Sequence, residues 1–414
     1  MLQILFADQR VGRLWDRFRK LCFQYSPEWC ENPKAFPLSP LMPLGNTVIC
    51  GDIPLFFFAN LLPEGNVLDT ILKLRRLPRG KVYSLLEAFG EDAAGAFSIV
   101  PDGSLPTRAS SYVPYSLERL HADLNRLGER LPLLVQHSEL RLSLAGAQNK
   151  IPVRYKNQLL SLPQGGASST HILKPPIQPT HYFPDSVQNE AFCLQLAKAS
   201  GLNVANVDLL HVPEPVLMVE RYDRLYSGDN IERIHQLDFC QMAGVLPDQK
   251  YEKDGGPGLK QIFHLIDQWS SVPAKNRLQA LDWVLFNYLM GNADAHAKNI
   301  SMLVHSRYQF ELAPAYDIVC TALYPELKTQ MAMNIGGEGN PKKLQTKHWQ
   351  RLAQDLGVNP VLLSKRAKQL AQRMDMCVPV AARQLDLTMH PIMGKIYAVL
   401  QERASDLETA LAGL

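Results

Sequence analysis

A short polar run follows a long apolar segment in the C-terminal half of the chain, MGNADAHAKNISML at 290–303. It contains Asp294, His296, Lys298 and Asn299 within six positions. An Asp followed five positions later by an Asn has the spacing of a protein-kinase catalytic loop. There the Asp accepts or orients the proton of an incoming hydroxyl, and the Asn amide oxygen holds a magnesium ion. The alternative is an ordinary polar loop that caps a helix, so this interpretation needs support elsewhere in the chain.

A second acidic residue, Asp317, lies downstream among apolar residues in LAPAYDIVCT. It follows Asn299 by 18 positions. In kinases a later Asp chelates the magnesium ion that bridges the nucleotide phosphates. A lone Asp after a strand usually belongs to a turn. Together with Asp294 and Asn299, however, it predicts a site for ATP and Mg²⁺.

Lys174 ends the apolar run THILKPP, which predicts a strand at 170–176 stopped by two prolines. A lysine there fits the strand lysine that contacts the α- and β-phosphates. Its expected partner is a carboxylate on the next helix, and Glu190 lies near the start of the amphipathic run 188–204. The alternative is a solvent-facing lysine and a Glu that merely favours a helix N-terminus.

A run of small and polar residues precedes the lysine strand by one strand. It begins at Ser143 and Leu144 and continues through Ala145, Gly146, Ala147, Gln148, Asn149 and Lys150. Small residues let backbone N–H groups approach phosphate oxygens. The run matches neither common glycine-loop motif, so its position favours a phosphate-covering loop more than its composition does.

The apolar run LMVERYDRL at 217–225 turns polar at its end. The backbone of Glu220, Arg221 and Tyr222 could there face an adenine between two lobes. The alternative is a strand followed by an exposed charged turn.

Other polar residues favour ordinary roles. His235, His264 and His305 have no partners at metal-ligand spacing, so no histidine metal site is expected. A small basic cluster favours a solvated face over a phosphate or DNA contact. It consists of Lys342, Lys343, Lys347 and Arg351.

The segments that must position these residues fall into three parts. A β-rich stretch comes first, then a second β-rich stretch with the helix at 188–204, which Gly201 is expected to end. Mostly helical patterns follow. Among them, 277–291 is apolar nearly all round and predicts a buried helix.

Composition narrows the function class. The 414 residues suggest two or three folded units. With 46% hydrophobic and 20% charged residues the chain is typical of a globular protein. The net charge of +3 is too balanced for a chain that binds nucleic acid by itself.

Cysteine usage and hydropathy suggest a location. The seven cysteines are widely spaced with no C-x-x-C pair, which argues against a disulfide framework or a zinc site and favours a reducing cytosol. The apolar stretches 53–63 and 280–291 fall short of the roughly 18 residues of a membrane span. The N-terminus has no apolar signal region, so we expect a cytoplasmic protein without a membrane partner.

Taken in order, the motifs become specific. They are SLAGAQNK, HILKPP, NEAFCLQLAKASGLNV, VERYDR, KYEKDGGPGL, GNADAHAKN and APAYDI. Together they resemble the HipA family of bacterial serine/threonine protein kinases, the toxins of HipBA-type toxin–antitoxin modules. The runs FFFANLLPEGNV and LLEAFGEDAAGAFSIVP resemble that family's N-terminal subdomain.

The resemblance implies an α+β, two-lobed protein-kinase-like fold. A small β-rich N-terminal subdomain would occupy 1–110, a kinase N-lobe with phosphate loop, lysine strand and hinge 111–225, and an all-α C-lobe with the catalytic loop 226–414.

The resemblance also implies residue roles. Asp294 would be catalytic, with Asn299 and Asp317 holding magnesium and Lys174 on the phosphates. The nucleotide would further contact the phosphate loop and the hinge, together with His296, Ala297, Lys298 and Tyr316. Ser143 matches the serine that the family autophosphorylates, which displaces the loop and stops the kinase.

The implied partners are a protein substrate such as an aminoacyl-tRNA synthetase, and a small helix-turn-helix antitoxin through which operator DNA would be reached. Asn149 departs from the family, whose members often carry Glu there, and the hinge aromatic is Tyr222. Neither change removes a charge that phosphoryl transfer needs. Two alternatives stay open: a small-molecule kinase, and a kinase-fold corepressor that acts with a DNA-binding partner.

Overall fold

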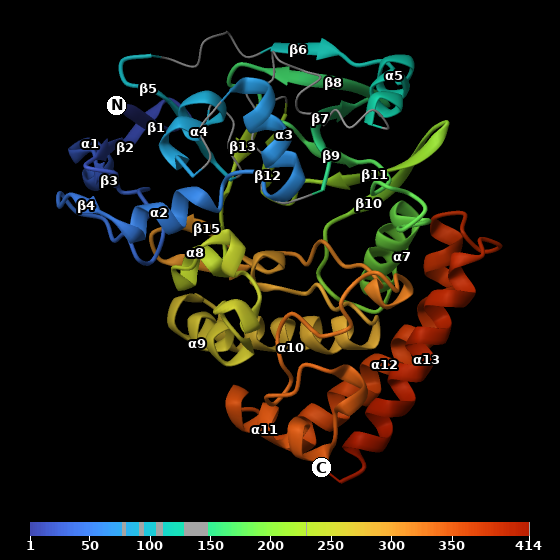
Figure 1. Cartoon of the computed structure of the whole chain (residues 1–414). Coiled ribbons are helices and arrows are strands. Elements are labelled where there is room, and N and C mark those ends of the chain that lie inside the picture. The colour runs from blue at the N-terminus through green and yellow to red at the C-terminus, as the bar shows by residue number, and fades with distance from the viewer. Residues whose placement is uncertain (77–79, 91–94, 105–110, 128–147, 229, 414) are drawn as a thin grey trace.

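The computed structural model describes residues 1–76, 80–90, 95–104, 111–127, 148–228 and 230–413. The N-terminal part is built on a five-stranded antiparallel sheet in the order β4-β3-β2-β1-β5. Its strands are β1 (Leu2–Phe6), β2 (Gln9–Arg17), β3 (Lys20–Tyr25), β4 (Ile49–Cys50) and β5 (Phe97–Pro101). Four helices accompany the sheet: α1 (Pro27–Glu31), α2 (Asp52–Ala59), α3 (Gly65–Arg75) and α4 (Val82–Phe89). The apolar stretch at 53–63 therefore includes a helix, and Figure 1 shows this part in blue at the upper left.

A six-stranded sheet forms the next part, in the order β10-β11-β9-β7-β8-β6. Its strands are β6 (Ser111–Pro114), β7 (Ile151–Lys156), β8 (Leu159–Gln164), β9 (His171–Lys174), β10 (Val207–Val212) and β11 (Glu214–Glu220). The helices that the structure describes in this part are α5 (Leu117–Leu127) and α7 (Ser186–Ala199). Helix α7 is buried on most sides and contacts β10, β11 and the C-terminal helix α12. It ends at Ser200 and Gly201, close to where Gly201 was expected to end it.

The C-terminal part is mainly helical, as Figure 1 shows in yellow to red. Its helices are α8 (Phe239–Ala243), α9 (Leu259–Trp269), α10 (Pro273–Leu289), α11 (Thr346–Leu356), α12 (Pro360–Gln384) and α13 (Ile392–Leu411). The expectation of an all-α lobe needs correction, because a hairpin and a three-stranded sheet also lie here. These are β12 (Arg224–Ser227) with β13 (Asn230–Arg233), and β14 (His235–Asp238) with β15 (Ser301–Ser306) and β16 (Gln309–Leu312). Each of these strands is four to six residues long, too short for its alternation to stand out beside the long helical runs of this part.

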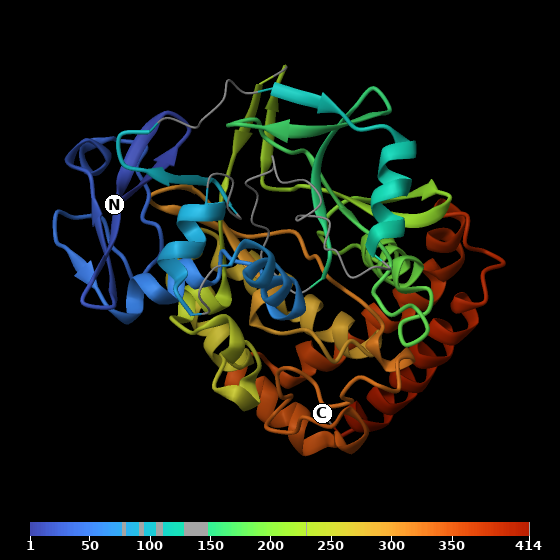
Figure 2. The same cartoon turned by 45° about the horizontal axis from the view of Figure 1, so that its top comes forward.

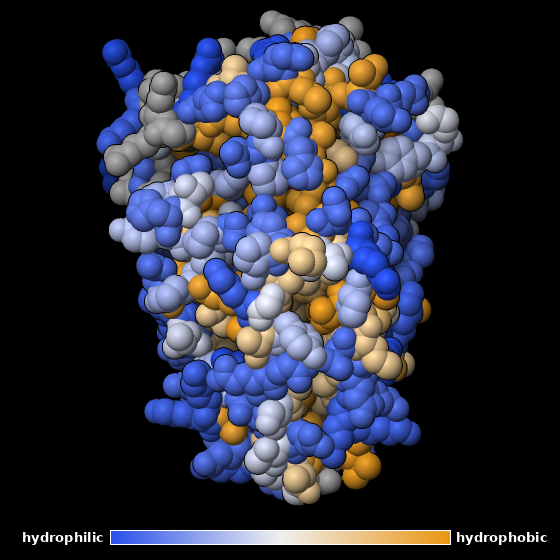
Figure 3. All heavy atoms as spheres, turned by 90° about the vertical axis from the view of Figure 1, so that its right-hand side faces the viewer, coloured by the Kyte–Doolittle hydropathy of each residue, from blue (hydrophilic) through white to orange (hydrophobic). Residues whose placement is uncertain are grey.

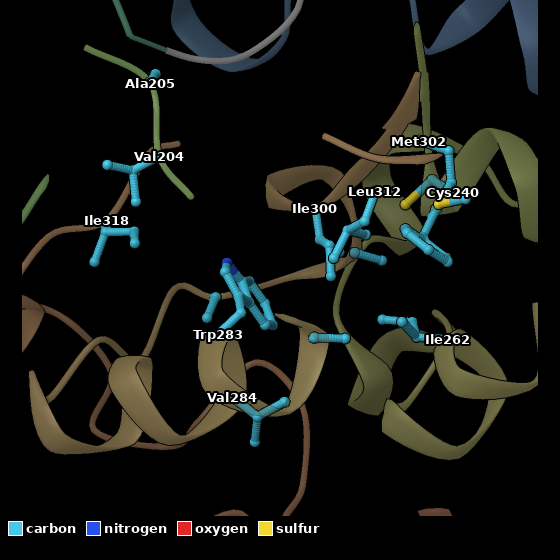
Figure 4. Packing of buried hydrophobic residues seen from close by; sticks show 14 of the residues in the cluster. Val204, Ala205, Cys240, Ile262, Trp283, Val284, Ile300, Met302, Leu312 and Ile318 are labelled. Carbon is cyan, nitrogen blue, oxygen red and sulfur yellow. The ribbon is translucent and has the colours of Figure 1, made fainter. Parts of the chain in front are cut away.

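One hydrophobic core joins the N-terminal sheet to the C-terminal helices. It includes Leu2, Phe58, Phe192, Leu285 and Leu400, all nearly inaccessible to solvent. Figure 4 shows part of it, with Trp283 of α10 on the side of Ile300 and Leu312, and Val284 pointing away from them. The six-stranded sheet has a smaller core of its own. Helix α10 is buried along most of its length, as its apolar sequence predicts.

One pair of cysteines departs from the sequence expectation. Cys22 and Cys50 lie directly opposite each other on β3 and β4 and form a disulfide. The other five cysteines are free. A single disulfide is not a framework, but it corrects the expectation of reduced cysteines throughout. A sequence separation of 28 residues gave no sign that strand pairing would bring the two together.

Figure 3 shows the face formed by the right-hand side of Figure 1. Its lower half is mostly hydrophilic, and apolar side chains gather nearer the top. Among the described residues, none of the helices combines the length and the hydropathy needed to cross a bilayer.

Candidate active site

Helix α10 leads directly into the catalytic-loop motif, in the part of the chain that lies below the six-stranded sheet in Figure 2. Gly291 turns the chain after the helix with φ of +64°. A Cβ there would lie 2.8 Å from Val399 Cγ1 and 2.9 Å from Ala322 Cβ, so the turn requires glycine. Asn292 then fixes the loop: its amide donates to Asn287 Oδ1 at 2.7 Å, and its Oδ1 accepts from the Asp294 N–H at 3.0 Å. Sequence reasoning missed this role of Asn292.

Asp294 and Asn299 lie in one hydrogen-bonded turn. The Asn299 amide donates to the backbone oxygen of Asp294 at 3.0 Å. The carboxylate of Asp294 accepts from the Tyr251 hydroxyl at 2.6 Å and keeps 52% of its side chain exposed. His296 Nε2 lies 4.0 Å from that carboxylate. Burial lowers the pKa of His296 to about 4, so the imidazole is neutral near pH 7.

Lys174 lies between two carboxylates that come from different parts of the chain. Its Nζ is 2.6 Å from Glu190 Oε1 on α7, and it also contacts Asp317 Oδ1. Lys174 and Lys150 hold the pKa of Asp317 well below its usual range, although burial opposes them. Burial raises the pKa of Glu190, and Lys174 offsets only part of that rise. Asp317 has φ of +55°, a left-handed conformation that non-glycine residues often adopt at functional sites.

The phosphate-loop prediction falls partly outside the described residues. Ser143, Ala145, Gly146 and Ala147 are not described, whereas Gln148, Asn149 and Lys150 are. Burial lowers the pKa of Lys150 to about 8, and Asp317 opposes this shift. Asn149 Oδ1 is buried with no hydrogen-bond partner among the described residues. A buried cation that acts on Asp317, together with an unpaired buried oxygen on the preceding residue, fits the binding of a polar, charged group.

The hinge prediction falls on the segment that connects β11 to β12. The N–H of Glu220 donates to Asn206 O and that of Arg221 to Thr170 O, both at 2.9 Å. The guanidinium of Arg221 makes two bonds to the Asp223 carboxylate, at 3.0 and 2.8 Å. Because Arg221 and Asp223 are both buried, the alternative of an exposed charged turn does not hold.

An aromatic pair, Tyr222 and Tyr316, lies at the hinge. The rings of Tyr222 and Tyr316 lie 5.7 Å apart. Tyr316 also donates from its hydroxyl to the backbone oxygen of Lys298 at 2.7 Å. Tyr316, which directly precedes Asp317, therefore contacts both the hinge and the catalytic loop.

The side chain of Lys298 leads away from this cluster. Its amine donates to Asn60 O at 3.1 Å and to Asn60 Oδ1 at 2.8 Å. It also lies 3.2 Å from Glu64 Oε1 and 3.4 Å from Asp238 Oδ2. Sequence reasoning missed these partners, together with Tyr251, although Asn60 and Glu64 lie in the run FFFANLLPEGNV and Tyr251 in KYEKDGGPGL.

The oxygen atoms of Asp317 and Asn299 are donors that fit a magnesium ion. Among the described residues, no group of three or more His, Cys, Asp or Glu side chains is arranged to hold a metal. Magnesium needs no such cage, because it takes one or two carboxylates together with phosphate oxygens and water. Asp317 supplies a carboxylate, and Asn299 supplies an amide in the same turn as Asp294.

A separate cavity of about 110 Å³ lies behind the catalytic loop. It is lined by residues of α10 and of the strands that flank the loop, including Trp283, Ile300 and Leu312, which face one another in Figure 4. Asn299 is among its lining residues, whereas Lys174 and Asp317 are not, so the cavity adjoins the catalytic loop without reaching the lysine cluster.

Comparisons with known proteins decide the family. Residues 2–100 match the HipA N-terminal domain, and residues 142–380 match the HipA-like C-terminal domain. The chain belongs to the HipA family of protein kinases. Y4mE of Sinorhizobium fredii is 38% identical over 397 residues, which cover 94% of this chain and 92% of that protein. The serine/threonine-protein kinase toxin HipA of Shewanella oneidensis is 32% identical over 412 residues, covering 94% of this chain and 90% of that protein.

The fold of a HipA protein matches as well. A structure of the Shewanella oneidensis HipA, HipB and operator DNA complex superposes with a TM-score of 0.81 at 29% identity. The match covers 99% of this chain and 96% of the other. The predicted two-lobed, kinase-like α+β fold is therefore confirmed, with the additional strands of the C-lobe noted above.

Proposed function

We propose that this HipA-family chain transfers the γ-phosphoryl group of ATP, with Mg²⁺, to a serine or threonine of a protein. The observation that carries the proposal is the pairing of the buried Lys174 with Glu190 and with Asp317. A strand lysine held between a helix carboxylate and a metal-binding Asp is the arrangement that phosphoryl transfer needs.

Each polar group would then have a role that its position allows. Lys174 contacts the phosphates, while Asp317 and Asn299 hold magnesium, which neutralises charge on the phosphate oxygens when it is bound. Asp294, with its exposed carboxylate, orients the attacking hydroxyl and accepts its proton. The backbone of Glu220, Arg221 and Tyr222 faces the adenine.

Two further segments would contact the nucleotide. The loop from Ala145 to Lys150 would cover the phosphates, and the backbone from His296 to Lys298 would border the nucleotide together with Tyr316. The Lys150 ammonium, which is close enough to Asp317 to lower the pKa of its carboxyl, supports this assignment for the loop.

Autophosphorylation offers a direct test of catalysis. Purified protein given labelled ATP and magnesium is expected to label itself on Ser143. Asp294→Gln should abolish the label, whereas Glu408→Gln, an exposed position on α13, should keep it. Undiminished labelling of the Asp294 variant would defeat the assignment of the catalytic residue, and wild-type protein that transfers no phosphate would defeat the proposal.

The protein substrate and the partner rest on the relatives. We propose a cytoplasmic toxin that phosphorylates a translation protein, such as an aminoacyl-tRNA synthetase, and that is restrained by a small helix-turn-helix antitoxin. The similarity to a HipA protein solved together with HipB and operator DNA supports the antitoxin. A phosphoproteome of host cells after induction should show one dominant synthetase site, and a spread of weak sites would argue against this substrate.

Contact with operator DNA would then run through the antitoxin. The net charge of +3 gives the chain little affinity of its own for DNA. Part of the basic cluster is already paired, with Lys342 3.3 Å from Glu402 and Arg351 3.9 Å from Asp355. We therefore expect no retardation of operator DNA by this chain alone, and retardation once the antitoxin is added. Tight binding by the chain alone would contradict this.

A further inference from the structure

A buried set of four charges links the N-terminal part of the chain to the catalytic loop. It consists of Glu64, Asp238, Lys250 and Lys298, and we call it the closed set. Lys298 approaches Glu64 at 3.2 Å and Asp238 at 3.4 Å, and Lys250 approaches the other oxygen of Glu64 at 3.0 Å. Between 5% and 16% of each side chain is exposed. Two positive charges thus face two negative charges out of contact with bulk water.

Glu64 is the centre of the closed set. Burial by itself would raise the pKa of its carboxyl, but Lys298 and Lys250 lower it below the usual range. Glu64 occupies the N-cap position of α3, yet its side chain makes no capping hydrogen bond there. Its carboxylate instead joins one lysine of the catalytic loop and the lysine that precedes Tyr251.

The N-terminal anchor of Lys298 is itself held firmly. Asn60, which gives two oxygens to Lys298, is almost fully buried. Its amide donates to Phe56 O at 2.8 Å within the same segment and to Val245 O at 2.9 Å in the C-lobe. Gln241 reinforces the contact by donating to Phe57 O at 3.2 Å. The end of α2 therefore offers Lys298 a fixed position.

Lys298 alone connects this anchor to the residues assigned to the reaction. Lys298 directly precedes Asn299, whose amide bonds to the backbone oxygen of Asp294. The carbonyl of Lys298 accepts from Tyr316, the neighbour of Asp317. A shift of Lys298 would therefore displace both groups assigned to magnesium and the carboxylate assigned to the hydroxyl proton.

We infer that Asn60 and Glu64, contributed by the N-terminal part, are positioning residues for phosphoryl transfer. They hold Lys298, and through it Asn299 and Asp294, in the geometry that the reaction requires. The inference rests on the proposed function for its catalytic consequence. A displacement of about 1 Å at such a site can lower a rate about a hundredfold. Buried ion pairs contribute little net stability against apolar side chains of similar size, so a structural purpose alone explains the closed set poorly.

Glu64→Gln in the full-length protein tests the inference, with Glu31→Gln as the matched control. Glu31 is an exposed glutamate at the end of α1 in the same N-terminal part. Two measurements are made: steady-state phosphoryl transfer, and amide hydrogen exchange of residues 292–300. For Glu64→Gln we expect kcat to fall at least about tenfold while the KM for ATP changes less than about twofold. Exchange in 292–300 should become at least about tenfold faster.

The outcomes separate this inference from the proposed function. Wild-type kcat and wild-type exchange in Glu64→Gln would overturn the inference. If wild-type protein transfers no phosphate, the proposed function fails, and the exchange of 292–300 still decides whether Glu64 holds the loop. If Glu64→Gln does not fold, the double variant Glu64→Gln, Lys250→Gln replaces it, since it removes one charge of each sign. Slow exchange in 292–300 of the folded double variant would overturn the inference, and fast exchange would support it.

Discussion

Two buried clusters in this protein have the same charges and differ in access to solvent. The closed set joins Lys250 and Lys298 to Glu64 and Asp238. A second cluster, the open set, joins Lys150 and Lys174 to Glu190 and Asp317. In the open set, the side chain of Asp317 is 36% exposed. No carboxylate of the closed set exceeds 13%.

The difference suggests two uses of one arrangement. The charges of the open set can exchange protein partners for phosphate and magnesium, because a ligand can reach them through the exposed side of Asp317. Charges enclosed between two parts of the chain cannot, so they can only hold those parts in register. Substitutions in the open set should therefore act on the chemistry, and those in the closed set on the geometry of the catalytic loop.

Asp317→Asn should have the largest effect. The substitution keeps the size of the side chain but removes the charge that we assign to magnesium, and it leaves Lys174 with Glu190 alone. We expect phosphoryl transfer to fall about a thousandfold, which corresponds to about 4 kcal/mol of transition-state stabilisation. Labelled ATP measures it, with Asp208→Asn on β10 as an exposed control. Transfer within tenfold of wild type would remove Asp317 from the metal site.

Lys174→Met should follow. It removes the contact assigned to the phosphates and leaves two carboxylates without their shared cation. We expect kcat/KM for ATP to fall about a hundredfold. Because an unpaired buried charge is costly, unfolding free energy should fall by about 3 kcal/mol. Urea titration measures the second effect, and Lys365→Met on the exposed face of α12 is the control. A normal KM for ATP would contradict the assignment.

The two sets should respond to pH with opposite signs. The pKa of Glu190 is raised to about 7 by burial, so the folded state holds its proton more tightly than the unfolded state. Its ionisation therefore costs stability as pH rises from about 4.3 to about 7. The pKa of Glu64 is lowered by Lys298 and Lys250, despite burial, so its contribution is present above about 4.3 and is lost as pH falls.

Urea unfolding of Glu190→Gln and Glu64→Gln, followed from pH 7 down to below about 4.3, measures both signs. The stability that wild type has over Glu190→Gln should shrink as pH rises toward 7, and its advantage over Glu64→Gln should shrink as the solution is acidified. Equal slopes for the two variants would show that Glu190, which shares Lys174 with Asp317, and Glu64, which faces two lysines, do not differ in the way that their neighbouring charges suggest.

The sequence predicted the open set better than the closed set, for a physical reason. Lys174 and Glu190 lie on a strand and the next helix, and a periodic pattern reveals both elements. Asp294 and Asn299 lie within one turn, so their spacing alone relates them. Lys298 and Asn60 are 238 positions apart, and only the packing of the N-terminal part against the C-lobe brings them together. No local pattern encodes that contact.

Contacts that arise only from packing also explain the other differences between the sequence-based predictions and the structure. The apolar run at 53–63 revealed its hydrophobicity but not that Asn60, which lies within it, meets the catalytic loop. Cys22 and Cys50 become neighbours only through the pairing of β3 with β4. The domain boundaries near residues 110 and 225 stay predictions, although the two matched family domains, at 2–100 and 142–380, are compatible with the first of them.

Tyr251→Phe should have the smallest effect. It tests whether the chemistry of the site and the positioning of the catalytic loop are carried by different residues. Tyr251 follows Lys250 of the closed set, and its hydroxyl donates to the exposed carboxylate of Asp294. The ring also packs edge-on against His296, with centroids 5.2 Å apart, and phenylalanine preserves that contact. Because half of the Asp294 side chain is exposed, water can replace the lost donor. We therefore expect kcat to change only about threefold, within the range of a single hydrogen bond. A loss as large as that of Asp317→Asn would mean that the Tyr251 hydroxyl takes part in the reaction, and that geometry and chemistry are not divided between the two sets.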